Sequence, residues 1–299
     1  MKQTDNGDRS RSSSLSSLIT SKTTNIMENK DIALKKKKCV FYDVKHSNNS
    51  ARVRLWLKLN GGLDAHIQTL TLTHADLDDG GKLVEVNPLK KVPAFVTDTG
   101  LNLFESFVIV SYLEDRFGDG RFTLANPEDR ALVQLFVRIH DIYISSPNCT
   151  QPHFSHTQGC MYLDPHPTHY TPERRIMPDP KVRASKLKEM YERLCWLEEN
   201  IRSDYMVGDR ITHADITWYP TCIFMEILLP YVFEWSPIFH EKDRFPRLTK
   251  WFETCTSNEH FASVRDDIYS VLKSQQRDGR FDCVRKVARD NPGLKWKYM

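Results

Sequence analysis

The stretch Asn87–Phe117 of this 299-residue chain reads NPLKKVPAFVTDTGLNLFESFVIVSYLEDRF and sets the expected fold of the first half. Residues 94–97 and 101–104 are short apolar segments, and the Asp98-Thr99-Gly100 link between them allows the positive φ that a hairpin turn needs. Pro93 precedes the first segment, where its missing N–H costs no ladder hydrogen bond. The stretch therefore begins with a predicted β-hairpin.

After this hairpin the pattern changes to that of a helix. Apolar residues recur at steps of three and four from Glu105-Ser106 onward, which predicts a helix to the end of the stretch. The residues of this stripe are Phe107, Val110, Leu113 and Phe117.

The preceding residues supply the rest of an α/β domain. Residues 39–44 predict a strand with Val40, Tyr42 and Val44 on one face, and residues 65–72 predict a second strand. Residues 51–60 between them predict an amphipathic helix. Its expected inward residues are Val53, Trp56 and Leu57, and its expected outward residues are Arg52, Arg54 and Lys58. Strand, helix, strand followed by strand, strand, helix is the thioredoxin-like order.

The second half of the chain predicts helices. Residues 128–144 and 181–201 have helical periodicity, and residues 245–251 and 261–272 predict two more helices. Thr212 with Asp215 three residues later is a capping-box variant that marks the start of another helix, which Pro220 should kink.

Residues 145–180 interrupt this helical half. Seven prolines exclude a continuous helix there, and an insertion of this length is usually functional or disordered. We expect an ordered wall of a binding pocket. The candidate lining residues are Tyr143, Phe154, His156 and Tyr162.

Two motifs resemble the cytosolic glutathione S-transferases. One is Asn87-Pro88-x-x-Lys91-Val92-Pro93 followed by a hairpin and Glu105-Ser106, and the other is Gly208-Asp209-x-x-Thr212-x-Ala214-Asp215. The resemblance spans about residues 38–270. It implies a thioredoxin-like domain over 37–118 and an all-helical domain over 127–272. The charged, apolar-poor composition of the ends predicts a disordered extension over 1–36 and, over 273–299, a tail or a loosely docked helix.

The resemblance also implies how glutathione would be held. In the family the proline after the Lys-Val pair is cis, and the main chain of the preceding residue pairs with the cysteinyl part of glutathione. Val92 and Pro93 occupy these positions. Lys91 corresponds to a partner of the glycyl carboxylate, and Glu105 with Ser106 to the pair that holds the γ-glutamyl end.

Ser47 is the candidate catalytic residue. It lies where the first strand passes into the first helix, in the sequence SNNSARVR of residues 47–54. A helix N-terminus offers free N–H groups and a partial positive charge, so a thiol placed there and given a hydroxyl hydrogen bond loses its proton more easily. Without the family context, a serine at this place is a helix cap. Ser50 and Tyr42 are the alternatives.

The octet resembles the Ser-type classes of the family, nearest the zeta and tau-like pattern. The zeta pattern has a cysteine two residues after the serine, and Asn49 stands there. This departure argues against isomerase activity on maleylacetoacetate and against the Cys-type classes.

Composition restricts the other possibilities. The net charge of +3 is too small to indicate nucleic acid or a membrane surface as the main partner. Seven scattered cysteines form no disulfide framework and no secretory segment precedes them, so we expect a reducing, cytoplasmic location. The Ser-rich N-terminus hints at organelle targeting but contains too many acids for a usual transit peptide. The longest apolar run, residues 222–233, is shorter than a membrane span.

The insertion also offers a rival, metal-binding interpretation. The potential ligands are Cys149, His153, His156, Cys160, His166 and His169. Their spacing matches none of the usual structural-zinc patterns, so we expect no metal.

The resulting functional prediction is a glutathione transferase with a role in detoxification. It would use glutathione as co-substrate to attack small electrophiles, or in related peroxidase or isomerase chemistry, and by family analogy it would be a homodimer. The alternative is a non-catalytic carrier or protein-interaction module with the same fold.

Overall fold

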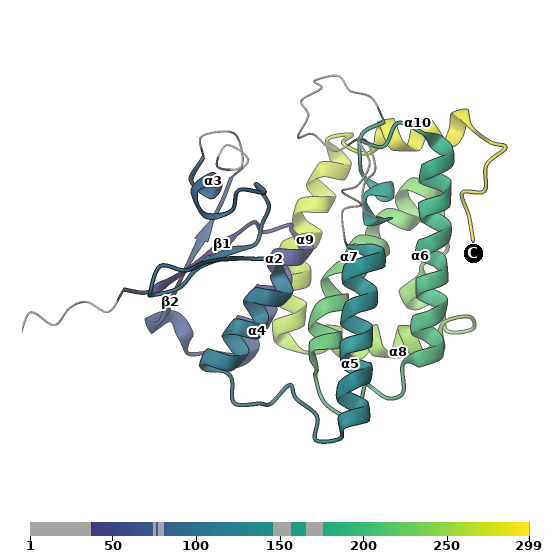
Figure 1. Ribbon diagram of the computed structural model, residues 1–299. Coiled ribbons are helices and arrows are strands. Elements are labelled where there is room, and N and C mark those ends of the chain that lie inside the picture. The colour runs from purple at the N-terminus through teal and green to yellow at the C-terminus, as the bar shows by residue number, and fades with distance from the viewer. Residues whose placement is uncertain (1–36, 74–75, 77–80, 146–156, 166–175, 299) are drawn as a thin grey trace, which may run out of the picture. The chain divides into compact units, whose positions relative to one another are not determined.

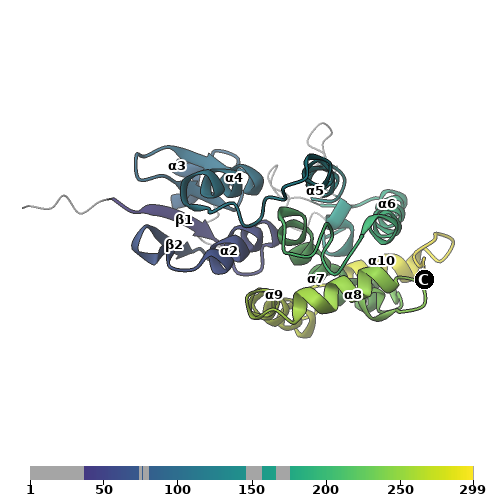
Figure 2. The same cartoon turned by 90° about the horizontal axis from the view of Figure 1, so that it is seen from below.

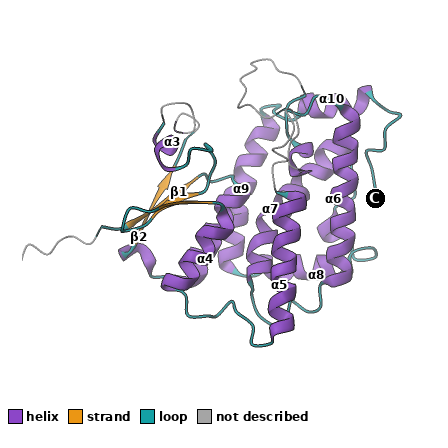
Figure 3. Ribbon diagram, in the orientation of Figure 1, coloured by secondary structure: helices purple, strands orange, loops and turns teal. Residues whose placement is uncertain are grey.

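Four strands of the chain form one mixed β-sheet in the computed structural model, which describes residues 37–73, 76, 81–145, 157–165 and 176–298. The strands are β1 (Cys39–Asp43), β2 (Ile67–Thr71), β3 (Ala94–Val96) and β4 (Asn102–Phe104). Their order in the sheet is β2-β1-β3-β4, with β1 parallel to β2 and the other two pairs antiparallel. Figure 3 shows these strands in orange, and the sheet confirms the thioredoxin-like prediction.

Helices cover both faces of this sheet. The apolar side chains of α2 (Asn48–Asn60) and α4 (Ser106–Phe117) share one core with Phe41 and Phe95. A smaller core on the other face includes Leu83 of the short helix α3 (Lys82–Val86), with Tyr42 packed against it. Tyr42 is thus a packing residue of the smaller core. A 3₁₀ turn, η1 (Leu63–Ala65), joins α2 to β2.

Helix α2 corrects one prediction about its faces. Val53 and Trp56 are buried as predicted, but the expected outward residues Arg52 and Arg54 are only 2% and 8% exposed. Arg54 donates from Nη1 to Asp43 Oδ1 at 2.5 Å and from Nη2 to the Lys45 carbonyl at 2.6 Å. Burial of a charged side chain requires such partners. The partners come from other elements, so helical periodicity did not reveal them.

The second half of the chain is helical, and Figures 1 and 2 show its helices grouped beside the α/β half. Two elements, α5 (Pro127–Ile139) and the π-helical turn η3 (His140–Ile144), form one continuous run. The others are η4 (Thr157–Met161), α6 (Pro180–Asn200), α7 (His213–Phe233), η5 (Ile238–His240), α8 (Pro246–Thr256), α9 (Glu259–Arg277) and α10 (Asp282–Asp290).

Helix α7 is the central element of this half. Its predicted capping box is present, because the main-chain N–H of Thr212 donates to Asp215 Oδ2 at 2.8 Å and the Thr212 hydroxyl accepts from the Ala214 N–H. Asp215 also accepts from Trp251 Nε1 of α8 at 2.8 Å, so the cap joins two helices. By length and composition α7 could cross a membrane, which the sequence analysis did not anticipate. Because 83% of its most apolar window is buried inside the protein, it reads as a core helix.

For residues 273–298 the structure shows a docked helical segment, which is one of the two alternatives predicted there, and not a tail. Helix α9 continues to Arg277, and α10 buries Val284 and Val287. Trp296 is 8% exposed, stacks on Phe233 and accepts a 2.6 Å hydrogen bond at its carbonyl from Trp235 Nε1. The segment has a low apolar content, but a few aromatic residues such as Trp296 dock it onto the helical half.

Candidate functional site

A cavity of about 910 Å³ brings together residues from the first half of the chain and from the helices. All six residues predicted for the site line it: Ser47, Lys91, Val92, Pro93, Glu105 and Ser106. Ser50 and Tyr42, the alternatives to Ser47, are not among the described residues on its wall. The structure thus gathers the predicted residues, while their roles remain predictions.

Ser47 is the N-cap of α2. Its Oγ accepts the Ser50 main-chain N–H at 3.2 Å, and its carbonyl accepts the Ala51 N–H at 2.8 Å. The cap uses a lone pair of the hydroxyl, so the hydroxyl hydrogen can still be donated to a group in the cavity. An anion placed there would also meet the positive end of the helix dipole.

The Val92–Pro93 peptide bond is cis, as the resemblance implied. The residue pairs of β3 begin at Ala94, so Val92 lies before the ladder at the cavity wall. Asn87 supports this loop, because its Nδ2 donates to the Lys91 carbonyl at 2.7 Å. An extended peptide could therefore lie along this edge as an added strand.

Glu105 precedes α4 and has a φ of 70°, a backbone conformation that residues other than glycine rarely adopt. Its side chain makes no hydrogen bond that caps α4. Ser106 Oγ accepts from Arg52 Nη1 at 3.1 Å and keeps its own hydroxyl hydrogen to donate. Backbone strain of this kind is commonly found at ligand-binding sites.

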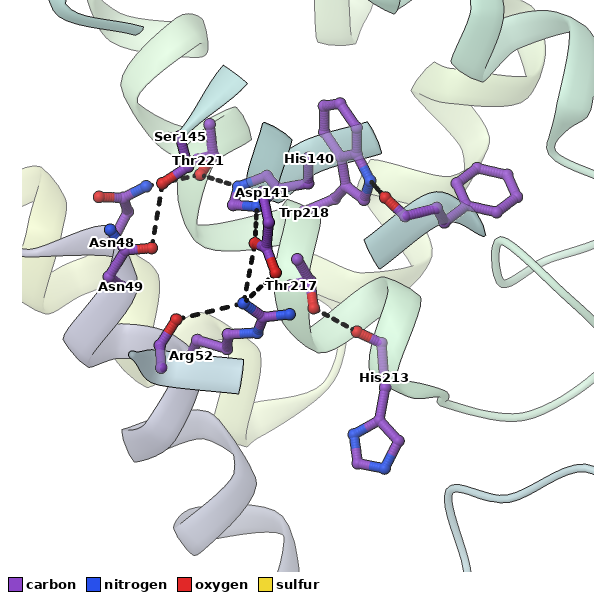
Figure 4. A network of polar contacts seen from close by, with 12 residues as sticks. Asn48, Asn49, Arg52, His140, Asp141, Ser145, His213, Thr217, Trp218 and Thr221 are labelled. Atoms are coloured by element: carbon purple, nitrogen blue, oxygen red, sulfur yellow. Dashed lines mark hydrogen bonds and ion pairs between the residues drawn. The ribbon is translucent and has the colours of Figure 1, made fainter. Parts of the chain in front are cut away.

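A polar network that the sequence did not predict joins α2 to η3 and α7 (Figure 4). Arg52 Nη1 contacts Asp141 Oδ1 at 3.0 Å, and the same Asp141 oxygen lies 2.9 Å from His140 Nδ1. His140 Nε2 lies 2.8 Å from the Thr221 hydroxyl of α7. Thr221 Oγ1 accepts from Asn48 Nδ2 at 2.7 Å, which returns the network to the start of α2. The first turn of α2 is therefore held by the helical half.

Three titratable groups in this network have shifted pKa values. Burial lowers the pKa of Arg52 although Asp141 lies beside it. Burial alone would raise the pKa of Asp141, but the charge of Arg52 and the hydrogen bonds from His140 and Arg52 outweigh it and lower the pKa to about 2. Burial lowers the pKa of His140 despite the neighbouring carboxylate. The network at neutral pH is therefore an Arg52–Asp141 ion pair extended by a neutral histidine.

The far wall of the cavity comes from the helical half. Tyr162, predicted as a lining residue, is on this wall, but Tyr143 is not. Tyr143 is 53% exposed, and the Arg193 guanidinium lies 5.5 Å from its ring centroid. The other predicted lining residues, Phe154 and His156, lie outside the described residues. Sequence reasoning missed Phe224 of α7 and four residues near the end of α9, which are Leu272, Gln275, Arg280 and Phe281.

The metal interpretation is mostly untested. Within the described parts of the chain, no group of three His, Cys, Asp or Glu residues is arranged to hold a metal ion. Five of the six potential ligands, Cys149, His153, His156, His166 and His169, lie outside those parts. Cys160 is buried, and burial raises the pKa of its thiol to about 12.

A thioredoxin-like domain with a cis-proline at its cavity, followed by a helical domain, defines the glutathione S-transferase class of protein. Two sequence profiles agree with the structure: the N-terminal domain of glutathione S-transferase matches residues 46–116, and its C-terminal domain matches residues 163–259. The chain belongs to the glutathione S-transferase family.

The curated proteins to which the chain is similar include elongation factor 1-gamma from several organisms. Elongation factor 1-gamma of Danio rerio is 28% identical over 195 residues, covering 64% of this chain and 38% of the relative. The human elongation factor 1-gamma is 27% identical and covers 69% of this chain and 41% of the relative. The matched region of the chain therefore corresponds to about two fifths of the length of these relatives, 38% and 41% respectively.

Among solved structures, the glutathione transferase URE2P5 of Phanerochaete chrysosporium has a TM-score of 0.59 at 15% identity, covering 80% of this chain and 98% of its own. A glutathione S-transferase of Methylobacillus flagellatus, solved with GSH bound, has a TM-score of 0.58 at 15% identity, covering 76% of this chain and 98% of its own. At these identities the likeness shows the fold.

Proposed function

We propose that this protein binds glutathione and transfers its sulfur to a small electrophile. The observation that carries the proposal is the meeting of Ser47 at the start of α2, the cis Val92–Pro93 edge and Ser106 at the start of α4 on one cavity wall. These groups match, in kind and arrangement, the needs of a tripeptide that carries a thiol between two charged ends.

Each end of glutathione has a counterpart. The Val92 main chain would pair with the cysteinyl part, and Lys91 would hold the glycyl carboxylate. Ser106 would donate to the γ-glutamyl carboxylate while Glu105 takes the ammonium group. The carboxylate of Glu105 and the ammonium group of Lys91 make no hydrogen bond or ion pair with another described residue, so both are available.

The reaction requires an ionised sulfur. The thiol proton passes to solvent, and the thiolate stays next to the Ser47 hydroxyl and the N-terminus of α2. Lowering a thiol pKa from about 8.5 by about two units requires roughly 2.7 kcal/mol of preferential thiolate stabilisation. The sulfur then forms a bond to the electrophilic carbon, and the group displaced from that carbon leaves with the bonding electrons.

The test is the Ser47→Ala variant, with Ser50→Ala as the matched control. We expect Ser47→Ala to lower kcat at least roughly tenfold and to abolish the ultraviolet absorbance of bound thiolate, because one hydrogen bond to a charged sulfur is lost. Retention on immobilised glutathione should persist. Ser50 is buried and does not line the cavity, so its variant should turn over like the wild type. Equal activity of Ser47→Ala and the wild type would refute the role of Ser47.

A second candidate function is a non-catalytic carrier or interaction module. It is favoured by the curated relatives, which carry the name elongation factor 1-gamma. Under this proposal the protein would take part in a larger assembly, and the cavity would not ionise a thiol. Failure of the wild type to be retained on glutathione, or retention without thiolate absorbance and without turnover of any electrophile, would favour this candidate.

We also propose that the protein forms a homodimer in the cytoplasm and takes part in detoxification. Exposed apolar side chains support an interface on α5 and η3, where Leu135 and Ile142 are each 47% exposed and lie about two helical turns apart. The six cysteines that the structure describes form no disulfide, which agrees with a reducing compartment. Light scattering of Leu135→Glu tests the dimer, and cell fractionation tests the location.

A further inference from the structure

The far end of the cavity carries a charge that glutathione would leave unused. Four described cavity residues make no ion pair or hydrogen bond through their charged groups with another described residue: Lys91, Glu105, Arg138 and Arg280. Asp141, by contrast, is already paired with Arg52. Under the proposed function, Lys91 and Glu105 bind the two ends of glutathione. The two arginines then remain without an ion-pair partner among the described residues, and Asp164, a further carboxylate on the cavity wall, already has an interaction partner.

The two arginines belong to different ends of the cavity. Arg138 precedes Asp141 by one turn, and Asp141 shares Arg52 with Ser106, so Arg138 lies on the glutathione side. Arg280 comes after α9, and the far part of the wall contains both the apolar residues Leu272 and Phe281 and the polar residues Gln275 and Asp164. Among the described residues of this part, Arg280 is the cation that makes no ion pair.

The turn between α9 and α10 places Arg280 at the cavity. Gly279 has φ 72°, and the Arg280 N–H donates to the Gln275 carbonyl at 2.9 Å. Phe281 is buried with its ring edge-on to Tyr231, at 6.4 Å between centroids, and Val284 anchors the first turn of α10. The backbone next to Arg280 is therefore fixed on both sides, while its side chain is exposed.

We propose that the second substrate of this protein is an apolar, aromatic-type electrophile with a carboxylate at the end away from the reacting carbon. The apolar wall of Phe224, Leu272 and Phe281 packs against its body, and Arg280 binds the carboxylate as a bidentate pair. The inference rests on the proposed function, because it takes the near end of the cavity as the glutathione site.

A matched pair of substrates tests the charge directly. The probes are 4-chloro-3,5-dinitrobenzoate and its methyl ester, which share the reacting carbon and differ in the charge on the opposite side of the ring. In both, the thiolate sulfur forms a bond to the carbon that bears chlorine, the carbon–chlorine bond breaks, and chloride leaves with the bonding pair. After division by the uncatalysed rates, we expect the wild type to favour the carboxylate about tenfold in kcat/KM.

The variants are Arg280→Gln, Arg280→Lys and, as the matched control, Arg277→Gln. Arg277 is an exposed arginine in the last turn of α9 that does not line the cavity. Arg280→Gln should raise KM for the carboxylate about tenfold and leave the ester and glutathione unchanged. Arg280→Lys should keep part of the preference, and the control should keep all of it. An equal loss of kcat/KM for the carboxylate and the ester in Arg280→Gln would overturn the proposal. The absence of a preference for the carboxylate in the wild type would also overturn it.

Binding without turnover separates this inference from the proposed function. The probe is 3,5-dinitrobenzoate, which has no leaving group, and its binding is measured by calorimetry. Arg280-dependent binding in a protein that turns over neither substrate would sustain the anion site and refute the transferase. Turnover of the ester with no measurable binding of the dinitrobenzoate would sustain the transferase and refute the anion site.

Discussion

The two ends of the cavity are built in different ways. The near end consists of the starts of elements: Ser47 caps α2, Val92 precedes β3 and Glu105 precedes α4. The far end consists of side chains from segments that meet only in the folded protein, such as Phe224 of α7 and Phe281 before α10. The near end therefore depends on local backbone geometry, and the far end depends on how helices dock.

The Arg52–Asp141 ion pair connects the two halves of the chain. Arg52 belongs to α2 beside Ser47, and Asp141 belongs to η3 in the helical half. We expect loss of this pair to lower the free energy of unfolding of the whole protein. Changes in the C-terminal segment should affect binding of the second substrate at the far end and leave glutathione binding unchanged. Four predictions test this comparison, in order of decreasing effect.

Loss of Arg52 should have the largest effect. Arg52→Gln leaves the Asp141 carboxylate without its cationic partner in a largely buried place, so we expect a loss of about 3–5 kcal/mol in the free energy of unfolding, measured by urea denaturation. Arg121→Gln is the control, because Arg121 pairs with Asp119 at the surface and such pairs contribute about 0–1 kcal/mol. Equal losses in the two variants would show that the Arg52 pair does not connect the two halves.

Loss of the Trp296 side chain should come next. Trp296→Ala removes a buried ring stacked on Phe233, and truncations of this kind cost about 3–5 kcal/mol. Because the contacts described for the C-terminal segment are made with the helical half, KM for the second substrate should rise while the glutathione Kd stays unchanged. Lys297→Ala, which removes an exposed pair with Glu234, is the control. A matching rise in the glutathione Kd would break the separation between the two ends.

Acid should weaken the pair in a predictable direction. The folded-state pKa of Asp141 is about 2, below the ordinary value of 3.8, so its contribution to stability is complete above pH 5 and is lost as the pH falls toward 2. The shift corresponds to roughly 2 kcal/mol. Urea unfolding between pH 6 and pH 3 should show a shallower pH dependence in Asp141→Asn than in the wild type. Arg121 also lowers the pKa of Asp119, but this pair lies at the surface, where solvent screens it, so Asp119→Asn should change the slope much less than Asp141→Asn.

Gly279→Ala should have the smallest effect and act at the far end only. At φ 72° an added Cβ would lie 3.0 Å from Asp282 Oδ2, so we expect a loss of about 1 kcal/mol in the free energy of unfolding. The matched control is Gly293→Ala, where a Cβ would meet nothing within 4 Å. The variant should weaken the preference for the carboxylate substrate, and an unchanged preference would show that the turn does not position Arg280.

Most of the near end was predictable because its signals are short. The hairpin, the helix beginning at Ser106, the Val92–Pro93 motif and the Thr212 cap each occupy a few consecutive residues. Local rules of turn formation, periodicity and capping act over that range. Periodicity predicted the first helix only from residue 51, and the structure begins it at Asn48 with Ser47 as the N-cap.

The far end and the network were not predictable in this way. The amphipathic pattern of α2 put Arg52 and Arg54 outward, but tertiary partners from β1, η3 and α9 bury both side chains. The charged C-terminal segment predicted either a tail or a loosely docked helix, and the stacking of Trp296 on Phe233 decided between them.

By itself, the sequence determined the order of elements, the family and the residues at the starts of α2, β3 and α4. The tertiary structure alone decided which charges are buried together, where the C-terminal segment docks and which side chains close the far end of the cavity. The physical reason is range: propensities and caps act between neighbours in the chain, whereas burial and ion pairing depend on residues such as Arg52 and Asp141, which are brought together only by folding.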